Sequence, residues 1–153
     1  MPIRVLVSGA GGDVAQGVLK ALRGSGLDLQ LHATCISEHS AWLHAGIQGF
    51  IAPPSSDPDY VDYLIRLMRH LEIQVYFPTV DSEIFKIARA RSFIEQETAA
   101  LVFVDDVDKV AICDDKLRTA EFLRQGGFAY PRTASAEDAP AGQLAAEFGF
   151  PSS

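Results

Sequence analysis

The sequence predicts an α/β protein with a Rossmann-like, doubly wound parallel sheet. Short β-branched segments alternate with segments whose apolar residues recur at helical spacing, and short loops join them. Such alternation is typical of right-handed βαβ units, in which helices cover both faces of a parallel sheet. A glycine-rich turn directly after the first segment agrees with this fold. The 153 residues, of which 48% are hydrophobic, suffice for a domain with its own core.

Five short segments rich in β-branched and aromatic residues are predicted as buried parallel strands. The first reads IRVLVS and ends at the glycine-rich turn, and the fourth reads IQVYFP and ends at a proline. In chain order, the expected strands cover residues 3–8, 29–36, 49–52, 73–78 and 99–104.

Helices are predicted between these strands, where apolar residues recur three or four positions apart. The first helix is ended by Gly24 and Gly26, and the third has the clearest apolar face in the chain. The Asp57-Pro58 pair is expected to give the third helix its N-cap and its first-turn proline. In chain order, these helices cover residues 14–22, 40–46, 61–71 and a segment around 84–88.

The pattern changes at Asp105, because helices then follow one another without an intervening strand. The expected helices cover residues 107–113, 117–125 and 140–148, and an extended segment covers 128–133. We therefore expect two parts, a Rossmann-like domain over residues 1–106 and linker helices over 107–153 that lead into a second module.

The composition argues against several classes of protein. The 20 Asp and Glu residues against 13 Lys and Arg give a net charge of −7, so nucleic acid is not the expected partner. No run approaches the roughly 20 apolar residues of a membrane span, and the N-terminus lacks a secretory pattern, so we expect a cytoplasmic protein without a membrane partner. Cys35 and Cys113 stand outside any metal-binding spacing, and no metal site is expected.

The residues that follow the strands are the candidates for ligand binding, because ligands of doubly wound sheets bind beyond the carboxyl ends of the strands. These residues cover 9–12, 37–39, 79–83 and 105–106. Gly9, Gly11 and Gly12 allow either backbone N–H groups that meet an anion or a purely structural tight turn. Val14 breaks the dinucleotide pattern GxGxxG/A, which disfavours binding of NAD or FAD.

A second motif lies at Asp114-Asp115-Lys116, which opens the helix LRTAEFLRQG and precedes FAYPRT. This order resembles the start of the ATP-grasp module, most closely that of ligases similar to the large subunit of carbamoyl-phosphate synthase. The segments VLVSGAGGDVAQGVLKAL and PPSSDPDYVDYLIRLMRHLEIQVYFPTVDSE resemble the N-terminal pre-ATP-grasp domain of the same family. The resemblance covers essentially the whole chain and implies that residues 107–153 include the truncated start of an ATP-grasp domain.

The resemblance implies roles for the residues that match the family. Lys116 occupies the place of a lysine that reaches the nucleotide phosphates, although an aspartate cap beside a solvated lysine would explain the same motif. The glycine turn and the loop with Thr79, Asp81 and Glu83 would bind the substrate or an anion, while Asp81 as a helix cap is the alternative. The complete enzyme would use ATP and Mg²⁺.

The further parts of an ATP-grasp enzyme are a strand lysine, a lid and magnesium ligands, expected beyond the FGFP segment at 148–151 and without counterpart in the sequence. We therefore expect no catalytic residue, no tightly bound cofactor and no ATP turnover by this chain alone. The expected partners are a catalytic ATP-grasp module, in the same gene or a separate chain, and a small carboxylate or amine substrate. A second copy of the chain, in a homodimer, is a further candidate partner.

Two alternative functions remain for such a chain. It would serve as a free-standing Rossmann-like module or subunit that binds a nucleotide or an anion, or as half of an NAD(P)-dependent oxidoreductase.

Overall fold

The structure is a computed structural model and describes residues 1–40, 43, 46–135, 137 and 140–149. It divides into two compact units, Met1–Val107 and Asp108–Ser153. Most of the helix expected over 40–46 and the second half of the FGFP segment, residues 150–151, lie outside the described residues. Among the helices that are described, none is both long enough and apolar enough to span a bilayer.

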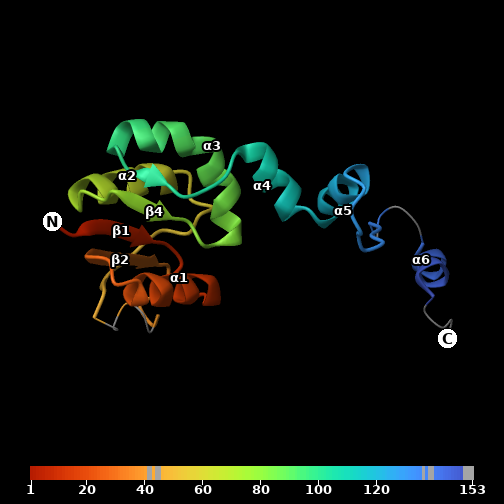
Figure 1. The fold of residues 1–153 in the computed structure, drawn as a ribbon, viewed down its shortest axis with the longest axis horizontal. Coiled ribbons are helices and arrows are strands. Elements are labelled where there is room, and N and C mark those ends of the chain that lie inside the picture. The colour runs from red at the N-terminus through yellow and green to blue at the C-terminus, as the bar shows by residue number, and fades with distance from the viewer. Residues whose placement is uncertain (41–42, 44–45, 136, 138–139, 150–153) are drawn as a thin grey trace. The chain divides into compact units, whose positions relative to one another are not determined.

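The first unit contains a five-stranded parallel sheet, which confirms the predicted fold class. Its strands are β1 (Ile3–Val7), β2 (Leu29–Cys35), β3 (Gln48–Ile51), β4 (Val75–Phe77) and β5 (Leu101–Val102). They lie in the order β3-β2-β1-β4-β5, and every neighbouring pair is parallel (Figure 1). The chain therefore places β2 and β3 on one side of β1 and then crosses over to place β4 and β5 on the other side.

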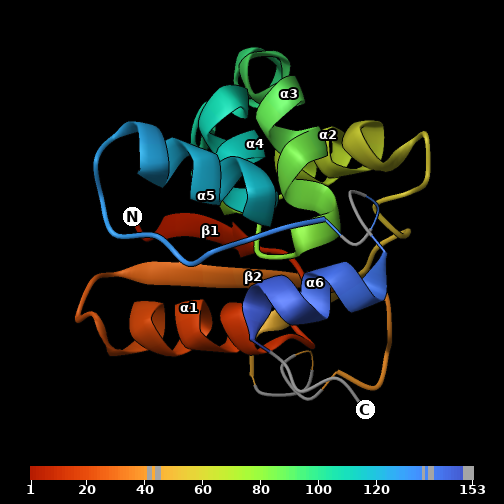
Figure 2. The ribbon, with the colours of Figure 1, turned by 90° about the vertical axis from the view of Figure 1, so that its right-hand side faces the viewer.

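Helices cover both faces of this sheet, as Figures 1 and 2 show. One face carries α1 (Asp13–Gly24), and the other carries α2 (Tyr60–His70) and α3 (Asp81–Thr98). The alternation of side chains along β1 produces the two layers, because Val7 packs in the cluster that includes α1 while Leu6 packs with α2 and α3. Both side chains are fully buried, and burial of one such side chain contributes about 1.5–3 kcal/mol.

The helix α3 is far longer than the segment that its apolar residues marked in the sequence. It begins at Asp81 and ends at Thr98, followed by Ala99 in a left-handed conformation with φ of 57°. The N–H of Ala99 donates to the carbonyl oxygen of Glu95 at 2.9 Å, which closes the last turn. Since Ala99 serves as this cap, the strand expected over 99–104 is reduced to β5, Leu101–Val102.

The N-cap predicted for the third expected helix was wrong in its position. The helix α2 begins at Tyr60, its N-cap residue is Asp59, and Pro58 precedes the cap instead of lying in the first turn. The Asp57 side chain accepts a hydrogen bond from the N–H of Asp59 at 2.8 Å, so it stabilises a turn that leads into the helix.

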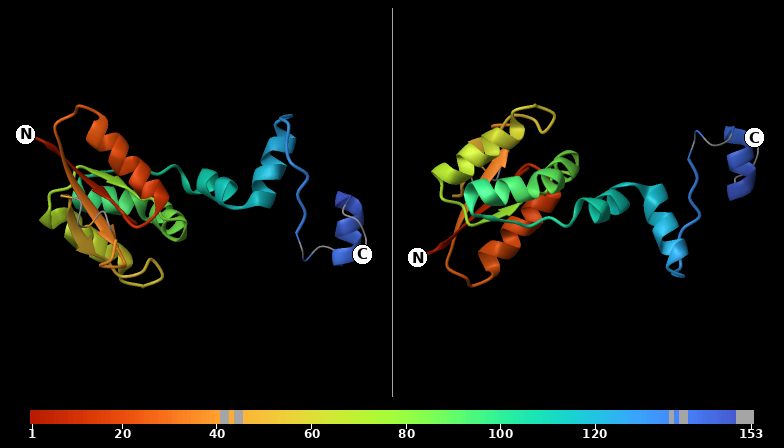
Figure 3. Two further views of the ribbon diagram at one scale, coloured as in Figure 1. Left: turned by 90° about the horizontal axis from the view of Figure 1, so that it is seen from below. Right: turned by 90° about the horizontal axis from the view of Figure 1, so that it is seen from above.

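The second unit consists of helices without a strand, as far as the described residues extend. They are α4 (Val107–Asp114), which starts at the last residue of the first unit, α5 (Lys116–Gln125) and α6 (Ala141–Phe148) (Figure 3). Arg132 in the connection between α5 and α6 donates to Glu147 at 2.9 Å and lies 5.2 Å from the centre of the Phe148 ring. These contacts hold that connection against α6.

Candidate functional site

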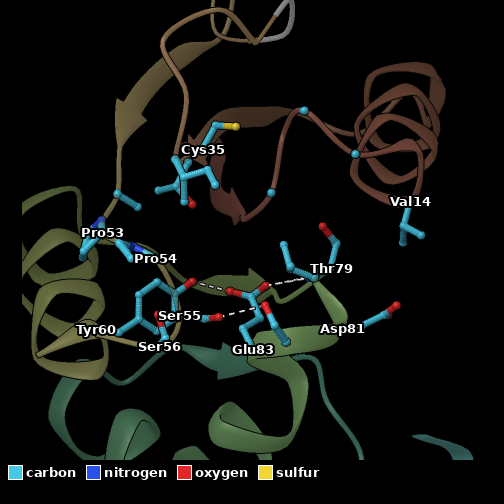
Figure 4. A pocket seen from close by; sticks show the side chains of 18 of the residues that line it. Val14, Cys35, Pro53, Pro54, Ser55, Ser56, Tyr60, Thr79, Asp81 and Glu83 are labelled. Carbon is cyan, nitrogen blue, oxygen red and sulfur yellow. Dashed lines mark hydrogen bonds between the residues drawn. The ribbon is translucent and has the colours of Figure 1, made fainter. Parts of the chain in front are cut away.

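A pocket of about 600 Å³ lies at the carboxyl ends of the strands in the first unit (Figure 4). Four chain segments form it, one at or after the end of each of the strands β1, β2, β3 and β4. The pocket includes the point where the strand order reverses, because the residues after β1 and after β4 form two of its walls. In doubly wound sheets this switch point is where ligands bind.

The lining confirms that Gly9, Gly11, Gly12 and the loop 79–83 come together, as the topology predicted. The other two predicted positions, residues 37–39 and 105–106, are not among the residues that line this pocket. The whole lining comprises residues 9, 11–14, 34–36, 52–56, 60 and 79–83.

Gly9 is required by the close approach of two pocket walls. Its φ is +63°, a conformation that side chains disfavour. A Cβ atom at this position would lie 2.3 Å from Cγ2 of Val80, which stands after β4. The N–H of Gly12 donates to the carbonyl oxygen of Gly9 at 2.8 Å and closes the turn. The tight-turn interpretation of the glycines is therefore sufficient to explain Gly9.

The start of α1 faces the same pocket and offers a limited site for an anion. Gly12 is the N-cap residue, and the first helical residues Asp13 and Val14 line the pocket. The Asp13 carboxylate accepts from the N–H of Val14 at 3.0 Å and places a negative charge where the helix dipole would favour a bound anion. An anion at this end of α1 would meet that charge.

Glu83 is buried and serves as the structural centre of the pocket. One of its carboxylate oxygens accepts from the Ser8 hydroxyl and from the N–H groups of Thr79 and Val80, at 2.9 and 3.2 Å for the two amides. The other oxygen accepts from the hydroxyl of Tyr60 and, at 3.4 Å, from that of Tyr76. Because both oxygens are engaged, Glu83 joins α2, α3, β4 and the end of β1 and has little capacity left for a ligand.

The two tyrosines beside Glu83 stay protonated in the folded chain. Burial raises the pKa of Tyr76 well above its ordinary value, and the nearby Glu83 charge raises it further. The pKa of Tyr60 is raised for the same two reasons, burial first. Neither hydroxyl is therefore suited to act as a base at neutral pH, and both serve as hydrogen-bond donors to the carboxylate.

Thr79 and Asp81 have different environments in the loop after β4. The Thr79 hydroxyl donates to the carbonyl oxygen of Ser8 at 2.6 Å, which ties the loop to the end of β1. Asp81 is the first residue of α3, whose N-cap is Val80, so the alternative that Asp81 caps this helix is wrong. Asp81 is exposed, and its carboxylate has no partner in the part of the chain that the structure describes.

Lys116 belongs to the second unit, whereas the pocket lies within the first. It is the exposed first residue of α5. The N-cap is Asp115, whose carboxylate accepts from the N–H groups of Leu117 at 2.8 Å and Arg118 at 3.2 Å. The aspartate in this motif therefore has a structural role that explains its position, and the lysine ammonium is left in solvent.

Sequence reasoning missed three features of the lining. Thr34 near the end of β2, Pro53 and Pro54 after β3, and Tyr60 at the start of α2 all line the pocket. The end of a predicted strand could have indicated Thr34, but the position of Tyr60 depends on how α2 packs. Within the described residues, no group of three or more His, Cys, Asp or Glu side chains is placed to hold a metal ion.

The fold and the pocket define an α/β Rossmann-like protein with a ligand-sized cavity at its switch point. No family model and no curated protein sequence matches the chain. Among solved structures it is similar to the biotin carboxylase subunit of pyruvate carboxylase, with 19% identity and a TM-score of 0.59 over 99% of this chain and 34% of that one. It is also similar to Gre2 of Candida albicans in complex with NADPH, with 19% identity and a TM-score of 0.49 over 66% of this chain and 35% of that one. The chain thus spans about a third of the length of either protein.

Proposed function

We propose that this chain is the N-terminal, substrate-side part of an ATP-dependent carboxylate ligase of the ATP-grasp class. The observation that carries the proposal is the likeness to a biotin carboxylase subunit, an ATP-grasp enzyme, over 99% of this chain. That likeness extends beyond the Rossmann-like unit into the helices that follow Val107. The sequence motifs support a more specific assignment, because they resemble those of ligases similar to the large subunit of carbamoyl-phosphate synthase.

The residues present fit one side of such an enzyme and leave the other side incomplete. In this proposal the pocket of the first unit receives the substrate, and the exposed Lys116 at the start of α5 contacts the nucleotide phosphates. The described residues include no acidic cluster that would hold Mg²⁺. ATP and Mg²⁺ would therefore be held largely by a catalytic module, supplied by the same gene or by a separate chain, and this chain alone would not turn over ATP.

The proposal is tested first on the gene and then on the protein. The reading frame, or a neighbouring gene, should encode a module with a strand lysine and magnesium ligands. The chain together with that module should release ADP when it is supplied with ATP, Mg²⁺, a carboxylate and an amine, whereas the chain alone should not. If neither gene encodes such a module, the proposal is wrong.

Lys116 gives the test a residue-level readout. Lys116→Met should lower kcat/KM for ATP about tenfold, as expected when one charge-assisted contact to a phosphate is lost. Lys20→Met is the matched control, because Lys20 is an exposed lysine on α1 that does not line the pocket. Equal effects of the two substitutions would contradict the assignment of Lys116.

A second candidate function is a free-standing module that binds a nucleotide or an anion, and a third is half of an NAD(P)-dependent oxidoreductase. The glycine turn that opens α1 beside the pocket favours both. Titration with NADH tests the oxidoreductase alternative, because the fluorescence of NADH increases when its nicotinamide is bound. A saturable enhancement at micromolar NADH would support the oxidoreductase alternative, and a flat response would exclude binding of this cofactor at those concentrations.

A further inference from the structure

The titratable side chains that line the pocket include acids but no lysine or arginine. Among the residues that line it, the acidic side chains are Asp13, Asp81 and Glu83. The ammonium group of Lys86 lies just outside, where it donates to the carbonyl oxygens of Ser55 and of Asp57, the latter at 3.0 Å. Both acceptors are neutral carbonyl groups, so Lys86 keeps its positive charge, but its ammonium group is held outside the lining and does not pair directly with a ligand inside the pocket.

Of the three carboxylates, Asp81 is the one available to a ligand. Glu83 accepts hydrogen bonds at both oxygens, and Asp13 accepts from the N–H of Val14. Asp81 has no partner in the described part of the chain and stands at the pocket wall after β4 (Figure 4). A carboxylate in this position can accept two or three hydrogen bonds from a cationic donor.

A second, independent observation points to a ligand with a hydrogen-bonding group. The Thr34 side chain lines the pocket although the residue is 1% exposed, and its hydroxyl has no partner among the residues that the structure describes. A threonine hydroxyl both donates and accepts hydrogen bonds. A bound molecule or a water would supply the missing hydrogen-bond partner of the Thr34 hydroxyl.

The remaining walls suit an apolar body. The Val80, Ile36 and Tyr60 side chains and the Pro53-Pro54 pair line the cavity between these polar groups. About 600 Å³ is enough room for a molecule larger than a simple ion. The pocket thus combines an apolar interior with an unpartnered carboxylate at one side.

We propose that the pocket binds a small primary amine whose ammonium group pairs with Asp81, and that it discriminates against carboxylate- and phosphate-bearing ligands. The apolar part of the amine lies against Val80 and Tyr60. An anion would lie near three acidic side chains and would find no lysine or arginine in the lining to pair with, which disfavours its binding. This inference rests on the proposed function, because it takes the pocket to be the substrate-binding site of a ligase. It adds that the substrate bound there is the amine.

The test uses three probes of nearly equal shape: 2-phenylethylammonium, phenylacetate and 2-phenylethanol. Each is titrated into the isotopically labelled chain at pH 7 and constant ionic strength, and amide shifts are followed by NMR. The ammonium probe should saturate the shifts of residues 9–14 and 79–83, with a dissociation constant roughly fivefold below that of the alcohol. Phenylacetate should bind more weakly than the alcohol.

Variants separate the pocket from the general negative charge of the chain. Asp81→Asn should remove most of the preference for the ammonium probe over the alcohol. Asp62→Asn, which removes an exposed carboxylate of α2 outside the pocket, should leave that preference unchanged. Tighter binding of phenylacetate than of the ammonium probe, or equal effects of the two variants, would overturn the inference.

The outcome is independent of ATP chemistry. If the ligase proposal fails while the ammonium probe binds at Asp81, the amine site stands without its catalytic setting. If ADP release is observed with a catalytic module while the pocket prefers phenylacetate, the amine assignment alone is wrong.

Discussion

The contact between Gly9 and Val80 makes a quantitative prediction about how the two walls of the pocket meet. Gly9→Ala places a Cβ atom 2.3 Å from Cγ2 of Val80 and forces alanine to adopt a φ of +63°. The left-handed conformation costs an alanine about 1–2 kcal/mol, and overpacking against a fixed neighbour costs about 1–3 kcal/mol. The free energy of unfolding should therefore fall by about 2–5 kcal/mol.

The assay is urea unfolding followed by circular dichroism, in which such a loss lowers the midpoint by roughly 1–2 M. Gly26→Ala is the matched control, because Gly26 also has positive φ, +73°, but open space around its Cβ position. It should cost only the conformational part, about 1–2 kcal/mol. Combining Gly9→Ala with Val80→Ala should recover the overpacking part. Equal losses for Gly9→Ala and Gly26→Ala, or no recovery in the double variant, would refute the close approach of the two walls.

Two further predictions concern protonation. Burial, followed by the charge of Arg4, lowers the pKa of His32, so the unfolded chain binds a proton that the folded chain does not, and stability should fall as the pH drops below about 6.5. Thermal unfolding from pH 8 to 5 should show a smaller decrease of the midpoint in His32→Leu than in the unmodified chain; the same decrease in both would contradict the role of His32. Burial raises the pKa of Tyr60 and of Tyr76, so stability should fall above about pH 10, and both should ionise only as the chain unfolds. Absorbance at 295 nm should show a late step that is smaller in Tyr60→Phe, and full ionisation of all tyrosines before unfolding would contradict the prediction.

The sequence was sufficient for the fold class because strands and helices alternate with clear periodicities. Exact boundaries depended on local conformations that periodicity does not encode. Ala99 ends α3 in a left-handed conformation, which shortens the next strand, and this conformation is uncommon for alanine. The Asp57-Pro58 pair has the composition of a helix start, yet the helix begins at Tyr60 because Asp57 stabilises the preceding turn.

The candidate site was predictable in part for a topological reason. Parallel strands bring their carboxyl ends to one edge, so the glycine turn and the loop 79–83 had to meet. The sequence could not predict that Glu83 has a structural role while Asp81 stays available to a ligand, because this difference depends on which of the two side chains is buried. A carboxylate is seldom fully buried, and Glu83 is buried because Tyr60 and Ser8 donate to it from segments distant in the sequence.

The hydrogen bonds of Glu83 have a consequence for how such a site can change over time. One side chain fixes the end of β1, the start of α2 and the loop after β4, so a substitution at position 83 would disturb all of them together. Asp81 lies two residues away and carries none of these bonds. The preference for one ligand over another can therefore diverge at position 81 while the architecture around position 83 persists. Substitution of Asp81 would therefore change ligand preference with little effect on the fold, whereas substitution of Glu83 would disturb the fold itself.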